Sequence, residues 1–284
     1  MAPNDGAASL TGTRSAMFDT LDGATRLYAL IGHPIAQVQS PPGVTRSMQA
    51  RGVNAVMVPV HVEPPGVDAL IDALTAVRNL DGICATIPHK FIAFRHARTA
   101  SDRARLLEAA NVLRRNADGT WHGDMLDGLG FVGAATAKGV EPRGKRALLV
   151  GAGGAGSAIA LALIDAGVRE LAIHDTEAER RDALIARLNA LGKVRVRPGT
   201  ADPTGCDLVA NATPAGMREG DPLPVEVAKL ALSTYCGCVV TKPDVSPFIE
   251  AARKIGCLTA TGTDMYQAQQ GRIIDFLLGK EAEG

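Results

Sequence analysis

The sequence has no long apolar run, few aromatic residues and no excess of either charge. A transmembrane helix needs about twenty mostly apolar residues in succession, and no such run occurs in the 284 residues. Basic and acidic residues number 30 each, and this balance argues against a broad surface for nucleic acid or anionic membranes. Residues 1–23 are small and polar and lack the apolar core of a secretory signal. We therefore expect a cytoplasmic protein, with a mobile leader over residues 1–24, that binds neither nucleic acid nor membranes.

Cysteine is also scarce, and its spacing offers no metal site. The five cysteines form no C-x-x-C pair and have no metal-ligand spacing with histidine. Cys236 and Cys238 stand two residues apart, which on a strand places both side chains on one face. We expect buried thiols in a reducing compartment and no bound metal.

Apolar runs typical of strands alternate with stretches typical of helices along most of the chain. We expect strands at 26–31, 55–62, 82–87, 147–150, 171–174, 207–211, 237–240 and 258–261, and helices at 66–78, 128–138, 157–166 and 176–191. This alternation predicts parallel sheets with helices on their faces, and so an α/β fold. Thr176 and Glu179 form a capping-box pattern at the start of the last of these helices, and Gly192 is expected to end it.

The strongest local signal is a glycine-rich turn, Gly151-Ala-Gly-Gly-Ala-Gly156, between a predicted strand and a predicted helix. Its first glycine permits the tight turn, its second lets the backbone approach a pyrophosphate, and its last lets the helix pack on the strand. The helix N-terminus that follows offers free amides to phosphate groups. This context predicts a Rossmann domain for a dinucleotide, with cofactor contacts at Gly151, Gly153, Gly154, Ala155 and Gly156.

Asp175 ends the next predicted strand, about 20 residues beyond the last glycine of the turn. A carboxylate there accepts hydrogen bonds from a ribose 2′-hydroxyl and repels a 2′-phosphate, so the sequence favours NAD over NADP. Arg180 and Arg181 oppose this interpretation because either could bind a phosphate. We interpret both as part of a solvated helix face.

Four further motifs are hard to explain as scaffold. They are Gly32-His-Pro-Ile-Ala-Gln-Val-Gln-Ser-Pro41, Ala85-Thr-Ile-Pro-His-Lys90, Gly123-Asp-Met-Leu-Asp127 and Asn211-Ala-Thr-Pro-Ala-Gly-Met217. Together with Asn111, and in this order, they resemble the shikimate dehydrogenase family, which includes quinate/shikimate dehydrogenases. The resemblance spans about residues 26–279. It implies a three-layer α/β/α substrate domain (25–126 and 262–284), a Rossmann NAD(P)-binding domain (127–261) and a cleft between them.

The resemblance also implies roles for single residues. Lys90 and Asp127 occupy the positions of an acid–base pair, in which the ammonium protonates the reacting oxygen and the carboxylate orients the lysine and a substrate hydroxyl. The implied substrate contacts are Ser40, Thr86, Asn111, Gln269 and the position of Val38. The implied cofactor contacts in the C-terminal half are Asn211, Thr213 and Met217.

Three departures from the family pattern concern the substrate. Val38 replaces the first of two serines that hold the substrate carboxylate, and Thr241 stands where a tyrosine is common. Met125-Leu126 replaces Asn-Thr, which we expect to make the substrate surroundings more apolar. A hydrogen bond to a charged group contributes roughly 1.5–3 kcal/mol, so the serine-to-valine change alone weakens carboxylate binding. Either shikimate is a poor substrate, or other groups such as Gln37 or Gln39 hold its carboxylate.

Three functions remain open at this point. The leading hypothesis is an NAD(P)-dependent dehydrogenase of shikimate, quinate or a related cyclic hydroxy acid, as in the shikimate pathway, acting as a monomer or homodimer. The second keeps this chemistry on a less anionic cyclic alcohol. The third is a non-catalytic dinucleotide-binding sensor, which would not require Lys90 and Asp127 together.

Overall fold

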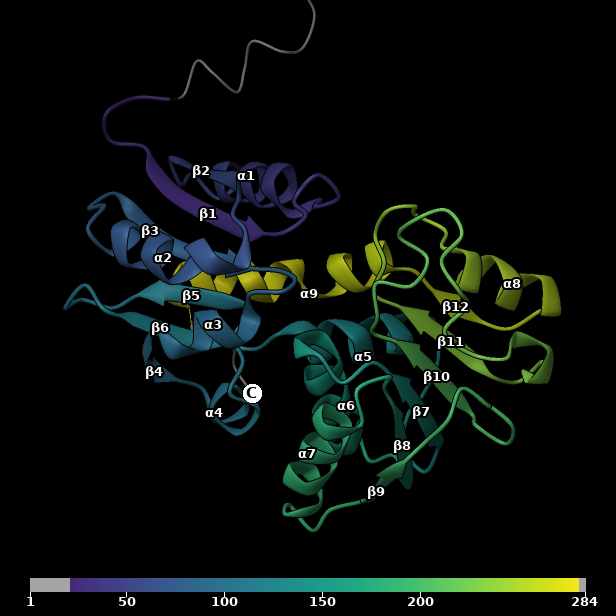
Figure 1. Cartoon of the computed structure of the whole chain (residues 1–284). Helices are drawn as coiled ribbons and strands as arrows, with labels where there is room; N and C mark the ends of the chain where they lie inside the picture. The colour runs from purple at the N-terminus through teal and green to yellow at the C-terminus, as the bar shows by residue number, and fades with distance from the viewer. Residues whose placement is uncertain (1–20, 281–284) are drawn as a thin grey trace, which may run out of the picture.

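The computed structural model describes residues 21–280, which form two α/β units joined along a pair of adjacent helices (Figure 1). The elements of the first unit are β1 (Arg26–Gly32), α1 (Ser40–Ala50), β2 (Ala55–His61), η2 (Pro64–Gly66), α2 (Val67–Thr75), β3 (Leu80–Ala85), α3 (Lys90–Arg95), β4 (Ala97–Ala100), α4 (Asp102–Leu107), β5 (Val112–Arg115) and β6 (Trp121–Asp124). Most of the leader expected over 1–24 lies outside the described residues. Within them, Asp22 accepts hydrogen bonds of 2.9 Å from the Ala24 amide and the Asn54 side chain.

The sheet of the first unit has the order β2-β1-β3-β5-β6-β4. β1 pairs in parallel with β2 and β3, whereas β5 pairs antiparallel with both β3 and β6. This sheet is therefore mixed, and the expectation of parallel sheets holds for it only in part. The reason is local: a tight turn closed by Asn116 and Thr120 joins β5 to β6, and strands joined by a tight turn must run antiparallel.

Alternate residues of β1 enter cores on opposite faces of this sheet. Tyr28 and Leu30 pack with α1 and with the last helix of the chain, α9 (Gly262–Leu277). Ala29 and Ile31 pack with α2 and α3 on the other face. The period of two is the one expected of a strand buried on both sides, and it produces three layers.

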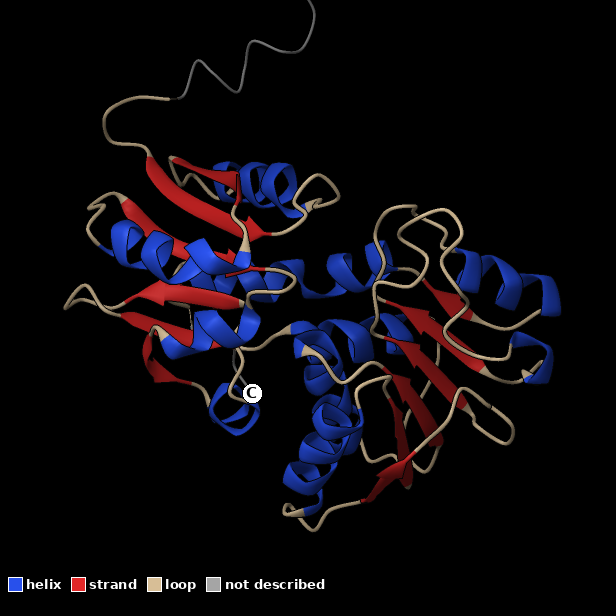
Figure 2. Cartoon of the chain, in the orientation of Figure 1, coloured by secondary structure: helices blue, strands red, loops and turns tan. Residues whose placement is uncertain are grey.

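The second unit is a parallel sheet with helices on both faces (Figure 2). Its elements are α5 (Asp127–Ala137), β7 (Arg146–Val150), α6 (Gly154–Asp165), β8 (Glu170–His174), α7 (Ala178–Asn189), β9 (Arg195–Pro198), β10 (Leu208–Asn211), η3 (Val227–Lys229), β11 (Tyr235–Cys238), α8 (Pro247–Ile255) and β12 (Thr259–Ala260). The strand order β12-β11-β10-β7-β8-β9 is that of a doubly wound Rossmann sheet, with its reversal between β7 and β10.

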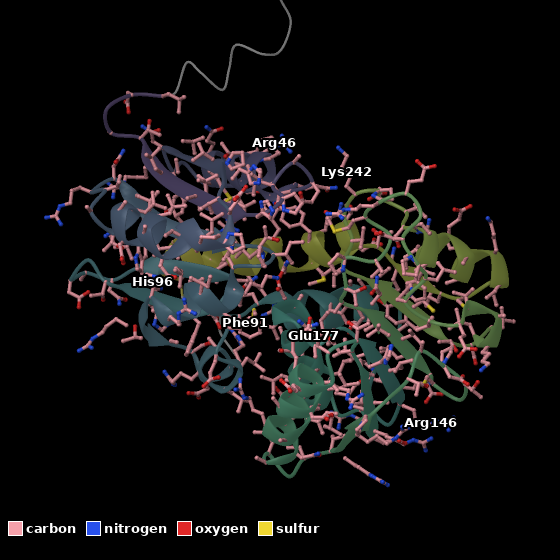
Figure 3. All side chains as sticks on the ribbon, viewed as in Figure 1. Arg46, Phe91, His96, Arg146, Glu177 and Lys242 are labelled. Carbon is pink, nitrogen blue, oxygen red and sulfur yellow. The ribbon has the colours of Figure 1, made fainter. Side chains whose placement is uncertain are left out.

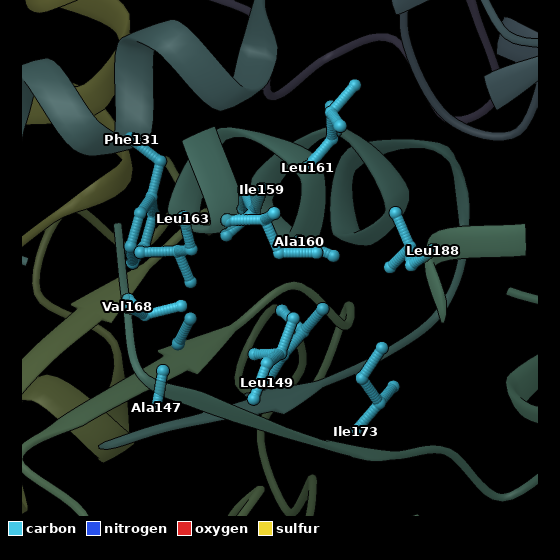
Figure 4. Close-up of a cluster of buried hydrophobic side chains, with 14 of the residues drawn as sticks. Phe131, Ala147, Leu149, Ile159, Ala160, Leu161, Leu163, Val168, Ile173 and Leu188 are labelled. Atoms are coloured by element: carbon cyan, nitrogen blue, oxygen red, sulfur yellow. The ribbon is translucent and has the colours of Figure 1, made fainter. Parts of the chain in front are cut away.

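The core of this unit lies between β7, β8 and β10 and the helices α5, α6 and α7 (Figure 4). Ile159 and Leu163 of α6 pack over Leu149, and Phe131 closes the core from α5. Each such buried side chain contributes roughly 1.5–3 kcal/mol to folding. On the opposite face, Cys236 and Cys238 lie together against α8, as their spacing predicts, and all five cysteines are free thiols.

α9 returns from the second unit to the first and packs along α5. Close packing there depends on glycines of α5. A Cβ at Gly128 would lie 2.1 Å from the Ala158 carbonyl oxygen of α6, and one at Gly130 would lie 2.9 Å from the Gln269 Cβ of α9. α5 therefore packs closely against α6 on one side and α9 on the other, and this packing joins the two units.

One local prediction is wrong. α7 begins at Ala178 with Glu177 as its N-cap, and no side chain caps it, so Thr176 and Glu179 form no capping box. Asp175 instead satisfies the backbone amide of the N-cap residue, because its Oδ1 accepts the Glu177 amide at 2.8 Å. Gly192 lies just beyond the helix with φ +65°, as expected. Across residues 21–280, no helix is both long and apolar enough to cross a bilayer.

Candidate functional site

A cleft of about 160 Å³ lies between the two units, at the carboxyl ends of their strands. It brings together most of the residues singled out from the sequence. From the predicted substrate and catalytic sets, the lining includes Val38, Ser40, Thr86, Lys90, Asp127 and Gln269, and from the predicted cofactor set it includes Ala155, Thr213 and Met217.

Lys90 and Asp127 form a hydrogen-bonded ion pair in this cleft. Lys90 is the first residue of α3 and Asp127 the first of α5, and their side chains are only 10% and 6% exposed. Buried charges of this kind depend on each other, since removing one leaves the other unpaired in a poorly solvated place. The pair thus holds an ammonium group and a carboxylate side by side at the cleft wall.

Asn111 lies behind Asp127 and is absent from the cleft lining. Its Nδ2 donates to Asp127 Oδ1 at 2.9 Å, and its Oδ1 accepts the Leu126 amide at 2.8 Å. In this arrangement Asn111 holds the carboxylate in one orientation. Its role as a direct substrate contact stays a prediction.

Gln269 and Thr86 offer polar groups to the cleft. Gln269 is buried, and its Oε1 has no hydrogen-bond partner among the described residues. An unpaired buried carbonyl oxygen is costly, and a ligand hydroxyl would satisfy it. Gly32 makes room for Thr86, since a Cβ there would lie 2.4 Å from the threonine Cγ2.

Side-chain and backbone groups bridge the two units at one end of the cleft. Gln39 Nε2 donates to the Thr241 carbonyl oxygen at 3.2 Å, and Thr241 Oγ1 donates to the Gln37 carbonyl oxygen at 3.3 Å. Gln37 Nε2 donates to the Pro34 carbonyl oxygen at 2.8 Å. Each of the two glutamine amides suggested by the sequence as carboxylate ligands therefore already uses one of its two N–H donors.

Met125 and Leu126 differ from the sequence-based expectation. The sequence suggested that they make the substrate surroundings more apolar. Their side chains are 1% and 3% exposed, pack in two hydrophobic cores and do not line the cleft. Their replacement of polar residues thus changes core packing, and the expected effect on the cleft is wrong.

The glycine-rich turn has the geometry that its sequence predicts. Gly151 has φ +100°, and a Cβ at Gly156 would lie 1.9 Å from the Gly151 carbonyl oxygen, so neither position accepts a side chain. A Cβ at Gly153 would meet no atom within 4 Å, whereas one at Gly154 would lie 3.0 Å from both Cβ and Cδ of Lys90. The turn therefore leaves open space in front of the α6 N-terminus and touches the catalytic candidate on its other side. No sequence motif predicts that second contact.

Asp175 is anchored at the tip of β8, with its side chain 3% exposed. It accepts the Ala152 amide of the glycine-rich turn at 2.6 Å and is paired with Arg180 at 2.7 Å. Burial alone would raise the pKa of this carboxyl, but hydrogen bonds from Arg180, Ala152 and Glu177 outweigh it and lower the pKa below its usual value. An ionised carboxylate paired with Arg180 therefore lies where the sequence predicts the cofactor ribose.

Asn211 organises the loop that carries Thr213 and Met217 to the cleft. It is fully buried, and its Oδ1 accepts the amide and hydroxyl of Thr213 at 3.1 and 2.7 Å. Its Nδ2 lies 3.3 Å from Cys238 Sγ. Across the part of the chain that the structure describes, no group of three histidine, cysteine or acidic side chains is placed to hold a metal ion.

A Rossmann sheet whose glycine-rich turn faces a buried lysine–aspartate pair defines the class of a dinucleotide-dependent oxidoreductase. The family model for the shikimate dehydrogenase substrate binding domain matches residues 30–113. The shikimate dehydrogenase (NADP⁺) of Rubrobacter xylanophilus is 38% identical over 247 residues, covering 85% of this chain and 87% of that protein. The chain belongs to the shikimate dehydrogenase family, whose members are oxidoreductases acting on CH–OH groups.

Solved structures of relatives share the whole architecture. Shikimate 5-dehydrogenase from Listeria monocytogenes, in complex with shikimate and NAD, superposes with a TM-score of 0.80 at 25% identity, covering 93% of this chain and 95% of that one. The ligand-free 5-ketofructose reductase of a Gluconobacter strain superposes with a TM-score of 0.78 at 26% identity, covering 91% and 95%. The two-domain α/β fold implied by the sequence motifs is thereby confirmed.

Proposed function

We propose that this protein catalyses reversible hydride transfer between NAD and a hydroxyl or keto group of shikimate, quinate or a related cyclic hydroxy acid. It would do so in the cytoplasm as a monomer or homodimer. The proposed domains are a substrate domain of residues 25–126 and 262–284 and a cofactor domain of residues 127–261. The observation that carries the proposal is the buried Lys90–Asp127 pair, which lines the same cleft as Ala155 of the glycine-rich turn.

The open space at Gly153 and the α6 N-terminus fit a dinucleotide pyrophosphate, with Asp175 placed for its ribose. When bound, the nicotinamide donates or accepts the hydride. As an ammonium, Lys90 Nζ would supply the proton to the alkoxide formed on reduction. On oxidation the neutral amine would receive the hydroxyl proton and become the ammonium. Asp127, held by Asn111, keeps the ammonium oriented toward the cleft.

The contact between Gly154 and Lys90 gives a test of this arrangement. In Gly154→Ala the new Cβ must displace Lys90, so kcat at saturating cofactor is expected to fall roughly tenfold. Gly153→Ala is the matched control, since its Cβ meets only the space left for cofactor, and it should weaken NAD binding while sparing kcat. Steady-state kinetics and NAD titrations separate the two, and identical effects of both substitutions would contradict the contact's role.

Several features support NAD over NADP. The Asp175 carboxylate would face a 2′-phosphate, and both candidate arginines are already paired. Arg180 lies 2.7 Å from Asp175 and 3.1 Å from Glu177, and Arg181 lies 2.8 Å from Asp182. Phosphate binding would require Arg180 to leave two carboxylates. The NADP⁺ specificity in the name of the Rubrobacter relative is the opposing observation.

Replacing Asp175 by alanine is expected to narrow the preference for NAD roughly tenfold, because the change removes a fixed negative charge and frees Arg180. The measurement is the ratio of kcat/KM for NAD and NADP in wild type and variant. Asp182→Ala, which frees Arg181 on the exposed helix surface, is the matched control and should leave the ratio nearly unchanged. A wild type that prefers NADP would contradict the assignment.

A second candidate function keeps this chemistry on a less anionic cyclic alcohol. Val38 lacks a donor for the substrate carboxylate at the end of the cleft where the family resemblance implies one. The 5-ketofructose reductase, in addition, is named for a keto sugar rather than a carboxylic acid. A screen of shikimate, quinate, their methyl esters and neutral ring polyols with NAD and NADP, followed by nicotinamide absorbance, separates the candidates. Turnover of neutral alcohols alone would favour the second function, and cofactor binding without any turnover would favour the sensor.

A further inference from the structure

Tyr266 of α9 lines the cleft together with Val38 and Ser40, although none of the motifs discussed so far assigns it a role. It follows Met265 and stands three residues before Gln269 on the same helix. Its hydroxyl makes one long hydrogen bond, 3.4 Å to the Ser40 carbonyl oxygen. A hydrogen bond of that length is weak, so the hydroxyl can instead donate to a ligand acceptor at shorter distance.

Gly43 of α1 leaves the space that the Tyr266 hydroxyl occupies. A Cβ at Gly43 would lie 2.4 Å from the tyrosine Oη and 3.4 Å from its Cζ. Gly43 has no positive φ, so its backbone conformation does not require glycine. Glycine inside a helix costs roughly 1 kcal/mol relative to alanine. The space for the hydroxyl accounts for this unfavourable residue.

The Tyr266 hydroxyl is a neutral donor, and two exposed cationic side chains belong to segments that border this end of the cleft. Burial, helped by Cys84, raises the pKa of Tyr266 to about 12 against smaller opposing effects of Arg46 and Ser40, so the hydroxyl stays a neutral donor at physiological pH. Arg46 and Lys242, both labelled in Figure 3, are exposed and make no hydrogen bond or ion pair with any described residue. Arg46 lies on α1, and Lys242 follows Thr241, which lines the cleft.

We infer that Tyr266 is a specificity-determining residue whose hydroxyl, beside Ser40, binds the anionic group of the substrate. It supplies one donor from α9, which compensates only in part for the donors missing at Val38 and Thr241, so a hydroxyl added at position 38 would still strengthen binding. The inference rests on the proposed function, because it assigns the group that recognises the carboxylate of a ring acid. The acid would then sit closer to α1 and α9 than two serines alone would place it.

The test compares a ring acid with its own methyl ester, which has the same ring and no charge. Tyr266→Phe in the full chain should raise KM for the acid roughly tenfold or more, the loss typical of a hydrogen bond to a charged group. kcat for both compounds and KM for the ester should stay within about twofold, because the hydroxyl is remote from the reacting carbon. A merely structural tyrosine would affect acid and ester alike.

Gly43→Ala provides a second, independent variant. Its Cβ must displace the Tyr266 hydroxyl, so the same selective loss for the acid is expected. A Cβ at Gly43 would also lie 2.9 Å from Gln270 Nε2, so Gly43→Ala in a Tyr266→Phe background measures any part of the effect that comes from Gln270. The acid-selective part of the loss should not increase further, because the tyrosine hydroxyl is already gone. Melting temperatures verify that each variant is folded.

The outcomes separate the inference from the function on which it rests. Suppose that wild type oxidises the acid. If Tyr266→Phe has the same KM for the acid, or if its KM rises equally for acid and ester, the inference alone is overturned. If wild type oxidises the ester or neutral alcohols but no acid, the ring-acid assignment is overturned and the inference with it. A selective loss for the acid in both variants supports both.

Discussion

Replacing Lys90 by alanine should lower kcat by about 10²-fold or more, within the range for lost general acid–base assistance. The change removes the ammonium that lines the cleft beside Asp127 and leaves that carboxylate held only by Asn111. Water can replace the lysine as a proton donor only poorly, since the position is nearly buried. The measurement is kcat at saturating NAD with the substrate found by the screen.

Two controls make the Lys90 result specific. Lys145→Ala removes an exposed lysine outside the cleft and should leave kcat unchanged. Because Lys90→Ala strands a buried carboxylate, its melting temperature is compared with that of Lys90→Ala/Asp127→Asn, which removes the unpaired charge. If the folded Lys90→Ala enzyme turns over at a near-normal rate, the acid–base assignment is wrong.

Replacing Val38 by serine should lower KM for shikimate by up to roughly thirtyfold, the equivalent of one charge-assisted hydrogen bond of about 2 kcal/mol. Val38 lines the cleft beside Ser40, so the new hydroxyl would restore the pair of serines that the family uses. The carboxylate binds similarly in the ground and transition states, and kcat should therefore change little.

Val38→Ala is the matched control, because it removes the valine methyl groups without adding a donor. It should not lower KM for shikimate, and Val38→Thr, which keeps the valine shape and adds a hydroxyl, should lower it in the same direction as serine. An unchanged KM in Val38→Ser, or tight shikimate binding by wild type, would mean that other groups already hold the carboxylate.

The second unit could be predicted from sequence in more detail than the first. Its strands and glycine-rich turn carry strong local signals, and β7, α6 and β8 lie within a residue or a few of their expected positions. β4, β5 and β6 of the first unit were missed because each has only four residues and no clear apolar alternation. The antiparallel pairing that results from β5 and β6 was missed with them.

In the candidate site, too, some residues could be predicted from the sequence and some contacts could not. Lys90 and Asp127 could be found because each belongs to a motif that can be recognised along the chain. The pairing of Gly43 with Tyr266 could not, because the two residues are distant in sequence and meet only after α9 packs on α1. The contact of Gly154 with Lys90 likewise joins segments from different units. Such contacts depend on tertiary packing, which no local pattern encodes.

The return of α9 also has a consequence for biosynthesis. Ile273, Ile274 and Leu277 complete a hydrophobic core with Tyr28 and Leu30, which are translated long before α9. The sheet that is translated first is therefore the last to have both of its faces covered. The Rossmann sheet, by contrast, has all of its strands once β12 has been made. Until then one apolar face of the early sheet stays uncovered, and this nascent intermediate is the form most in need of chaperone protection.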